Sequence, residues 1–255
     1  GGGKYYLVFK ELQAVISFLT IIPVSKSSSG PDINFIASVM YLFPLVGAII
    51  GIAVGALAYI ISFYLTSLVL GFIIVLVLIV ITGVNHTDAL ADFADGLMAK
   101  GGKEIKHRAM SDPAVGSAGV VALVLYLSGM IIILSSSTTS TKLYAGIISA
   151  EIIAKYVMVL QAYSGRSAWE GFSSPFTKAM KDKRKFVVAT GIALPLIFFA
   201  TGLIGMVSLC ASVIVAIIIK YSANRSFGGI SGDVLGASNE ISRLSSLIVM
   251  SSFNL

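Results

Sequence analysis

Residues 68–98, LVLGFIIVLVLIVITGVNHTDALADFADGLM, join two segments of opposite character. The first, which ends at Val84, contains no charged side chain and is long enough to cross a membrane as a helix. The second carries three of the chain's twelve acidic residues within eight positions: Asp88, Asp92 and Asp95. The junction therefore predicts a transmembrane helix that runs directly into an acidic helix at the membrane surface.

The three aspartates follow the spacing i, i+4, i+7, which places their carboxylates on one stripe of a helix, about 60° wide. Leu90, Phe93 and Leu97 occupy the opposite side. A solvated acidic face is the common explanation for such a stripe. The other is a bound Mg²⁺, which takes oxygen ligands and usually also binds substrate phosphates. In this membrane context we expect Mg²⁺, and we expect the polar segment 85–112 to carry the catalytic groups.

Composition determines the class of protein. Of the 255 residues 56% are hydrophobic and 12% are charged, whereas an ordinary globular domain has about 25% charged residues. This predicts an all-α, polytopic membrane helix bundle, with residues 1–255 forming a single integral-membrane domain. Gly1–Gly3 are interpreted as a tag remnant. Cys210, the only cysteine, excludes an intrachain disulfide and a cysteine metal site.

The apolar runs predict about six to seven transmembrane helices arranged in hairpins. Spans are expected at 35–61, 68–84, 118–134, 143–163, 186–201 and 204–219. Residues 5–22 fit an interfacial or re-entrant helix better than a full transmembrane span, because Lys10 and Glu11 interrupt their apolar character. The ladder Gly47-x-x-x-Gly51-x-x-x-Gly55 predicts close packing against a neighbouring helix.

Loop charge predicts the orientation. Lys and Arg fall almost entirely in the long loops on one side, up to Arg243, and the opposite turns contain only Lys142. The positive-inside rule places the long loops in the cytoplasm, so we expect a multi-pass protein of the cell membrane whose active site faces the cytoplasm. The net charge of +6 then reflects topology and anionic lipid, and no nucleic-acid partner is expected. The sequence leaves a homo-oligomer open.

Other polar groups admit two explanations each. Asp112, before Pro113, is either a helix cap or a fourth carboxylate folded toward the stripe. His86 could act as a base, a metal ligand or a capping residue, but in a regular helix from Asn85 it points away from the acids. Glu151 and Lys155, inside a predicted span, form either a structural ion pair or part of a functional site.

A glycine-rich stretch, FGGISGDVLG, covers residues 227–236 and is followed by Glu240. Such a turn at a helix start can offer backbone N–H groups to phosphate. The candidate substrate-binding residues in and around it are Arg225, Gly228, Gly229, Gly232, Asp233 and Glu240. The signal is weak alone and gains weight from the acidic stripe on the same predicted face.

Several ordered motifs resemble the cobalamin synthase family, adenosylcobinamide-GDP ribazoletransferase. His86–Gly96, HTDALADFADG, is similar to the signature HxDGLADxxDG, and 228–240, GGISGDVLGASNE, to GGxTGDxLGAxxE. The segments FLTIIPV (18–24), FPLVGAIIG (43–51) and MSDPAVGSAG (110–119) match further family elements. The likeness covers most of the chain. The departures are Ala89 for a glycine, Ser111 and Ala114 for basic residues, and Arg243 for an acid.

The resemblance implies a membrane transferase that joins adenosylcobinamide-GDP to α-ribazole, or to α-ribazole phosphate, and releases GMP. In that reaction Asp88, Asp92 and Asp95 are expected to bind Mg²⁺. Asp112 or His86 would orient or deprotonate the acceptor hydroxyl. The turn 228–236 with Asp233 would contact the nucleotide end of the donor.

Two other functions compete with this one. A CDP-alcohol phosphotransferase also uses membrane-facing aspartates, but its motif DxxDGxxAR differs from the spacing DxxxDxxDG found here. An ion or solute transporter would use Glu151 and Lys155 on its pathway. Most acids gather at one face rather than at the membrane midplane, which favours an enzyme.

Overall fold

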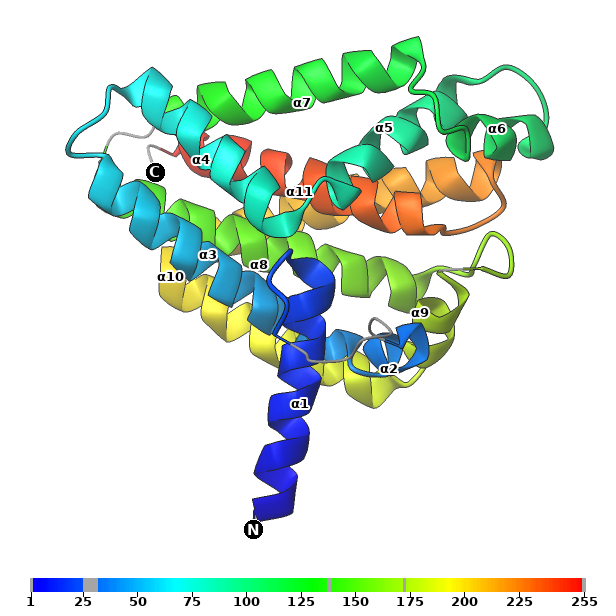
Figure 1. Cartoon of the computed structure of the whole chain (residues 1–255), viewed down its shortest axis with the longest axis horizontal. Coiled ribbons are helices and arrows are strands. Elements are labelled where there is room, and N and C mark those ends of the chain that lie inside the picture. Colours follow the sequence, from blue (N-terminus) through cyan, green and yellow to red (C-terminus); the bar gives the residue numbers. More distant parts are fainter. Residues whose placement is uncertain (1, 25–31, 137–138, 172, 254–255) are drawn as a thin grey trace.

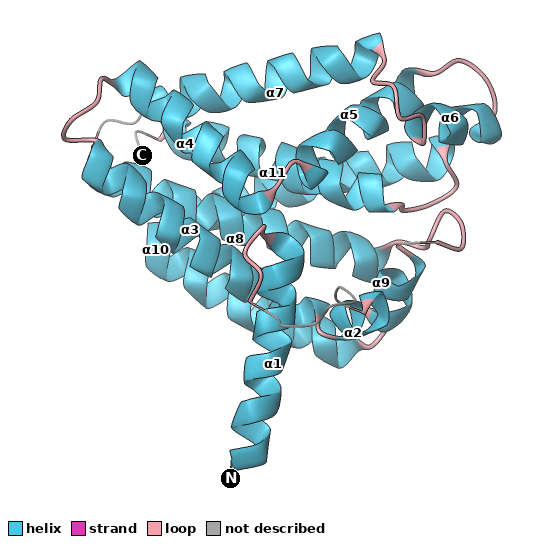
Figure 2. Ribbon diagram, in the orientation of Figure 1, coloured by secondary structure: helices cyan, strands magenta, loops and turns pink. Residues whose placement is uncertain are grey.

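The computed structural model describes residues 2–24, 32–136, 139–171 and 173–253, and these contain helices and no β-strand (Figure 2). The elements are α1 (Gly2–Leu19), α2 (Ile33–Ser38), the 3-10 helix η1 (Met40–Leu42), α3 (Phe43–Ile61), α4 (Ser67–Thr82), α5 (Asn85–Met98), α6 (Lys103–Met110), α7 (Ser117–Ser135), α8 (Ser140–Ser164), α9 (Ser174–Ala179), α10 (Lys183–Ser226) and α11 (Gly232–Ser252). The predicted all-α bundle is confirmed. Gly1 of the predicted tag remnant and residues 25–31 lie outside the described residues.

Four stretches of the described chain are helical, long and apolar enough to cross a membrane: Met40–Ile61, Ser117–Ser135, Ser140–Ser164 and Lys183–Ser226. There are five if α4 and α5, which meet at a bend of 94°, form one broken span. The number is below the predicted six to seven. One reason is that the last two predicted spans both lie within α10, on either side of a kink at Gly202.

The helix α10 reverses direction at Gly202, whose φ of +62° and ψ of −142° lie outside the helical region. Its first leg runs antiparallel to α8, with Tyr156 Oη 3.1 Å from Thr190 Oγ1 and Ser149 Oγ 2.8 Å from Thr201 Oγ1. Its second leg runs parallel to α8, because Gln161, farther along α8, donates to the carbonyl oxygen of Ala216 at 2.9 Å. The tight hairpin predicted between the last two spans is thus confirmed.

The central helix is α8, which packs between α3, α10 and α11 (Figure 1). The predicted glycine ladder forms its contact with α3. A Cβ added at Gly47 would lie 2.6 Å from the carbonyl oxygen of Glu151, and one at Gly51 would lie 2.7 Å from Cα of Ile148. The glycines therefore let the two backbones approach more closely than side chains would permit.

The helix α11 corrects the expectation that Arg243 is a loop charge. Residues 220–243 form the end of α10, the glycine-rich turn and the start of α11, and α11 lies inside the bundle. Glu240 is only 1% exposed and Arg243 only 3%, so Arg243 is not one of the loop charges. This buried helix contains many polar side chains, so a search for long apolar runs does not predict it.

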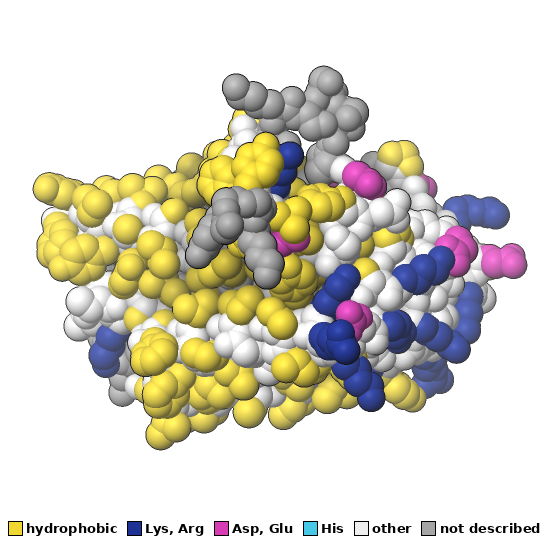
Figure 3. Space-filling model, turned by 90° about the horizontal axis from the view of Figure 1, so that it is seen from below, with side chains coloured by type: hydrophobic (Ala, Val, Ile, Leu, Met, Phe, Trp, Pro, Cys, Tyr) yellow, Lys and Arg dark blue, Asp and Glu magenta, His cyan; other side chains and the backbone are white. Residues whose placement is uncertain are grey.

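The two ends of the bundle differ in charge. Lys and Arg side chains gather toward the end that carries α6 and α9, and hydrophobic side chains cover most of the remaining visible surface (Figures 1 and 3). The helix α1 extends crosswise from the bundle, exposed at Tyr6–Lys10 and buried at Val15 and Leu19. It is not among the helices apolar enough to span, in line with the expected interfacial helix.

Candidate active site

The acidic helix begins at a sharp break in the chain. Thr82 ends α4, and Gly83 follows with a φ of +70°, a backbone conformation that glycine adopts without strain. The next helix, α5, starts at Asn85 and runs at 94° to α4. The break turns the acidic helix away from the direction of α4, so that it runs toward α6 at the basic end (Figure 1).

The two faces of α5 are as the sequence predicts. Leu90 and Phe93 are buried, Asp88 is exposed, and Asp92 and Asp95 are half-buried. The buried face crosses α11, where a Cβ added at Gly236 would lie 2.5 Å from Cβ of Ala89. The contact with α11 brings Asp233, in the first turn of that helix, toward the acidic stripe.

Asp95 has a structural partner. Its carboxylate accepts hydrogen bonds from the backbone N–H of Gly116 at 2.7 Å and of Gly119 at 2.8 Å, through its two different oxygens. These groups belong to the start of α7, whose first N–H groups have no partner within the helix. A carboxylate is favoured there by the helix dipole. Of the three predicted metal ligands, Asp95 therefore also anchors α5 to α7.

The remaining acids form a carboxylate cluster, which we define as Asp88, Asp92 and Asp233. Burial, and then the charges of Asp88, Asp233 and Asp95 in that order, raise the pKa of Asp92 to about 6. Burial is also the largest cause that raises the pKa of Asp233, and Asp88 adds to it. The cluster thus concentrates negative charge, and it includes Asp233, the residue predicted to contact the nucleotide end of the donor.

The donor chemistry of the cluster fits a hard cation. Among the described residues no three or more His, Cys, Asp or Glu side chains are arranged to hold a metal ion by themselves. Mg²⁺ commonly uses one or two protein carboxylates and completes its shell with water and substrate phosphates. Asp88 and Asp92, one helical turn apart, provide such a pair.

The glycine-rich turn is held by the loop after α8. The backbone N–H of Ile230 donates to the carbonyl oxygen of Arg166 at 2.7 Å, and Ala168 N–H donates back to Ile230 at 2.9 Å. Arg166 Nε also donates to the carbonyl oxygen of Gly228, at 3.1 Å, and Gly228 has a φ of +89°. At Gly229 there is no room for a Cβ against this loop. The turn therefore has a structural role whatever else it binds.

Basic side chains surround this turn. Lys103 of α6 lies beside Gly228, and Arg166 contacts it from the opposite loop. Arg225, the predicted phosphate contact, is exposed in the last turn of α10. His107 packs on Trp169 with ring centroids 3.7 Å apart. The sequence marked the basic loops, but only the fold shows that Lys103 and Arg166 meet at the glycines.

His86 points away from the acidic stripe, as a regular helix from Asn85 requires. Its Nδ1 is 3.4 Å from Nδ2 of Asn239 and 3.9 Å from Oε1 of Glu240, both on α11. Asn239 also donates to Glu240 at 2.8 Å. His86 is thus separated from Asp88 and Asp92 by its own helix.

Glu240, predicted to bind substrate, instead belongs to a buried charge network, which we define as Glu151, Lys155, Glu240 and Arg243. Lys155 Nζ is 3.1 Å from Glu151 Oε2, and the Arg243 guanidinium pairs with both glutamates. It also donates to Tyr126 Oη at 2.9 Å. Two positive and two negative charges balance in this network, and Arg243 is the partner that was not predicted from the sequence.

Asp112 lies apart from the cluster. It is exposed, and its Oδ1 accepts from the N–H of Ala114 at 2.9 Å in an Asx turn before α7. It shares a cavity of about 310 Å³ with Asp95. Asp112 therefore stabilises a turn before α7, and Asp95 is the acid of the stripe that shares a cavity with it.

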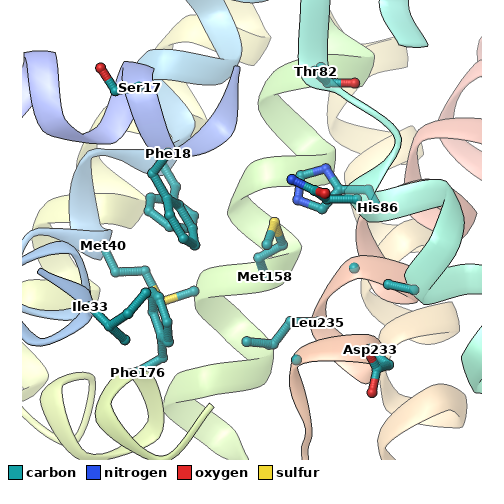
Figure 4. A pocket seen from close by; sticks show the side chains of 15 residues that line it. Ser17, Phe18, Ile33, Met40, Thr82, His86, Met158, Phe176, Asp233 and Leu235 are labelled. Carbon is teal, nitrogen blue, oxygen red and sulfur yellow. The ribbon is translucent and has the colours of Figure 1, made fainter. Parts of the chain in front are cut away.

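A larger cavity, of about 510 Å³, lies beside the break before α5 (Figure 4). His86 and Asp233 line it from one side, and Phe18, Ile33, Met40 and Phe176 from the other. Cavities of this size are typical small-molecule sites. The polar side of this one includes a member of the carboxylate cluster.

Residues 11–251 match the family described as cobalamin-5-phosphate synthase. The chain belongs to this family. Among its relatives, the adenosylcobinamide-GDP ribazoletransferase of Methanocella arvoryzae is 33% identical over 257 residues, covering 94% of each chain. Proteins of the same name from Methanosarcina barkeri and Pyrococcus abyssi are 30% and 31% identical, covering 97% and 94% of this chain and 92% and 97% of theirs. No solved structure matches the chain.

The cobalamin-5-phosphate synthase match confirms the resemblance drawn from the motifs. It spans α5, the glycine-rich turn and all four residues of the buried charge network. The match covers nearly the full length of the chain, so the carboxylate cluster and the cavity beside it lie within the residues that match the family.

Proposed function

We propose that this chain transfers the cobinamide phosphate of adenosylcobinamide-GDP to the hydroxyl of α-ribazole or α-ribazole phosphate and releases GMP. The carboxylate cluster carries this proposal, because it joins desolvated acids from two helices beside a cavity and next to a basic rim, which we define as Lys103, Arg166 and Arg225. Family membership favours this transferase over a transporter or a CDP-alcohol enzyme.

Asp88 and Asp92 are the residues that would hold Mg²⁺. When bound, the ion supplies positive charge to the phosphoryl oxygens, which is the main requirement of phosphoryl transfer. Asp95 supports the pair by fixing α5 against α7. Lys103 and Arg166, beside the glycine-rich turn, would bind the diphosphate of the donor.

Asp233 is the best-placed base for the acceptor hydroxyl. It lines the large cavity and belongs to the cluster, whereas Asp112 is exposed and lies in its Asx turn. Burial raises the pKa of Asp233, which makes its carboxylate a stronger base than a solvated aspartate. The acceptor oxygen forms the new P–O bond, its proton passes to Asp233, and the P–O bond to GMP breaks.

The basic end of the bundle would face the cytoplasm of a multi-pass protein in the cell membrane. In that orientation the cluster, the glycine-rich turn and the basic rim all meet the compartment that supplies nucleotides.

Release of GMP by the protein in liposomes tests the proposal. With Mg²⁺, adenosylcobinamide-GDP and α-ribazole or its phosphate, we expect GMP and a cobalamin product in equal amounts, and neither after EDTA. Asp92→Asn should reduce turnover at least about a hundredfold, because one of the two carboxylates that would hold Mg²⁺ loses its charge. Asp182→Asn is the matched control, since Asp182 caps α10 and Asn also caps well. Folded protein that makes no GMP with either acceptor would refute the proposal.

A further inference from the structure

The cavity of about 510 Å³ has two walls of different chemistry (Figure 4). One is mainly aromatic and apolar, with Ser17 as a polar member. The rings of Phe18, Phe43 and Phe176 have centroids 5.7, 6.1 and 6.4 Å apart, and they come from three separate elements, α1, α3 and α9. Ile33 and Met40 extend this wall. Three segments of the chain are thus brought together around a space that flat apolar groups can enter.

The facing wall is polar. Thr82, Asn85 and His86 line it at the break between α4 and α5, and Asp233 lines it from the first turn of α11. Asp233 is also a member of the carboxylate cluster. One ligand could therefore touch the aromatic wall with one end and place its other end beside the cluster.

We propose that this cavity binds the acceptor nucleoside, with its flat aromatic base against Phe18, Phe43 and Phe176 and its ribose directed toward Asp233. This inference rests on the proposed function and adds the subsite that holds the base of the acceptor. The cavity suits an aromatic bicycle with few hydrogen-bonding groups, of the benzimidazole kind.

The other parts of the two substrates fit this cavity less well. A phosphate or diphosphate placed against the aromatic wall would lose hydration without gaining a charged partner. Guanine presents several hydrogen-bonding edges, which hydrocarbon and thioether side chains leave unpaired. The corrin ring with its amide side chains is both larger and more polar. A flat apolar base is the part that gains most by leaving water here.

Met158 sets the size of the subsite. It extends from α8 to lie between the aromatic wall and His86, and it is 5% exposed (Figure 4). An unbranched thioether adapts its shape to a flat ring. Shortening this side chain enlarges the space for a base, and a rigid ring at the same position fills it.

The test compares two acceptors, benzimidazole riboside and the larger naphthimidazole riboside, on the full chain in nanodiscs. Equilibrium dialysis measures riboside binding, and GMP release measures turnover. Met158→Ala should improve the preference for the larger base at least about tenfold in both measurements. Met158→Phe should weaken benzimidazole riboside binding at least about tenfold and leave the KM for adenosylcobinamide-GDP within about twofold. Met130→Ala, at a methionine of α7 that is 1% exposed and lines no described cavity, should change neither preference.

The outcomes separate this inference from the proposed function. Base selectivity that stays the same in both Met158 variants, with GMP release intact, overturns the subsite and leaves the transferase standing. Riboside binding that follows the size of residue 158 without any GMP supports the subsite and refutes the transferase. A cavity that retains a lipid acyl chain, and from which neither riboside displaces it, overturns the subsite.

Discussion

Asp88, Asp92 and Asp95 share one helical stripe, yet the structure gives them different surroundings. Asp95 accepts two backbone hydrogen bonds from the start of α7, whereas Asp92 faces Asp88 and Asp233. Helical spacing predicts the stripe correctly, because it depends only on the 100° turn per residue. It does not predict which acid meets the end of a later helix, because that partner lies more than twenty residues along the chain.

Asp92 should make activity dependent on both pH and Mg²⁺. Its pKa is raised to about 6, so it becomes protonated as the pH falls through that value and then no longer binds a cation. Transferase activity should therefore fall on the acid side near pH 6. Mg²⁺ stabilises the ionised form, so a higher Mg²⁺ concentration should move this midpoint to lower pH. GMP release between pH 5 and 8 at several Mg²⁺ concentrations measures this midpoint. A midpoint that does not change with Mg²⁺ concentration would contradict the role of Asp92 as a Mg²⁺ ligand.

Asp95 should contribute to stability through α7. Asp95→Ala removes two hydrogen bonds to backbone N–H groups and should lower the free energy of unfolding by about 1–3 kcal/mol. Asp95→Asn keeps one acceptor oxygen and should lose less. Thermal unfolding in detergent compares the two, with Asp112→Ala as the control because Asp112 caps only its own exposed turn. Equal losses for Asp95→Ala and Asp112→Ala would argue against the anchor.

At the scale of elements, the contact between α5 and α11 depends on a small pair, Ala89 and Gly236. The family signature carries glycine at the position of Ala89. In this chain the methyl group of Ala89 leaves no room for a side chain at position 236, which is glycine. The sequence showed the departure at Ala89 but not its consequence, because the two residues are far apart in the chain. The helix α11 was itself missed, since its buried Glu240 and Arg243 resemble loop charges.

Gly236→Ala should destabilise the protein, because its Cβ would lie 2.5 Å from Cβ of Ala89. Overpacking of this kind costs about 1–3 kcal/mol. Ala89→Gly in the same chain should recover part of that loss, even though glycine inside a helix costs about 1 kcal/mol. A double-mutant cycle on thermal unfolding measures the coupling, and strictly additive changes would show that the two helices do not meet at these residues.

For the whole molecule, the buried charge network joins α8, at the centre of the bundle, to α11. Apolar runs and loop charges were sufficient to predict a membrane bundle with Lys and Arg gathered at one end, because both patterns follow from the bilayer. The pairing of Arg243 with Glu151 and Glu240 could not be predicted, since ion pairs between helices depend on their relative register.

Arg243→Met should destabilise the bundle by about 3–5 kcal/mol, because it leaves two buried glutamates with one lysine. Glu240→Gln added to that variant restores neutrality and should recover part of the loss. The yield of monodisperse protein and the unfolding midpoint report both effects. Added salt should change the midpoint little, because the ions are shielded from solvent. If Glu240→Gln worsened Arg243→Met, charge balance would not be the function of the network.

The network also determines where Asp233 lies. Asp233 and Glu240 are seven residues apart on α11, so they share a face and are separated by about 10 Å along the axis. A shift of α11 along α8 by even one residue would unpair Arg243 from Glu151 and would carry Asp233 the same distance from Asp92. The four charges at the centre of the bundle therefore set the register of α11 on α8, and through it the spacing between Asp233 and Asp92, two helical turns away.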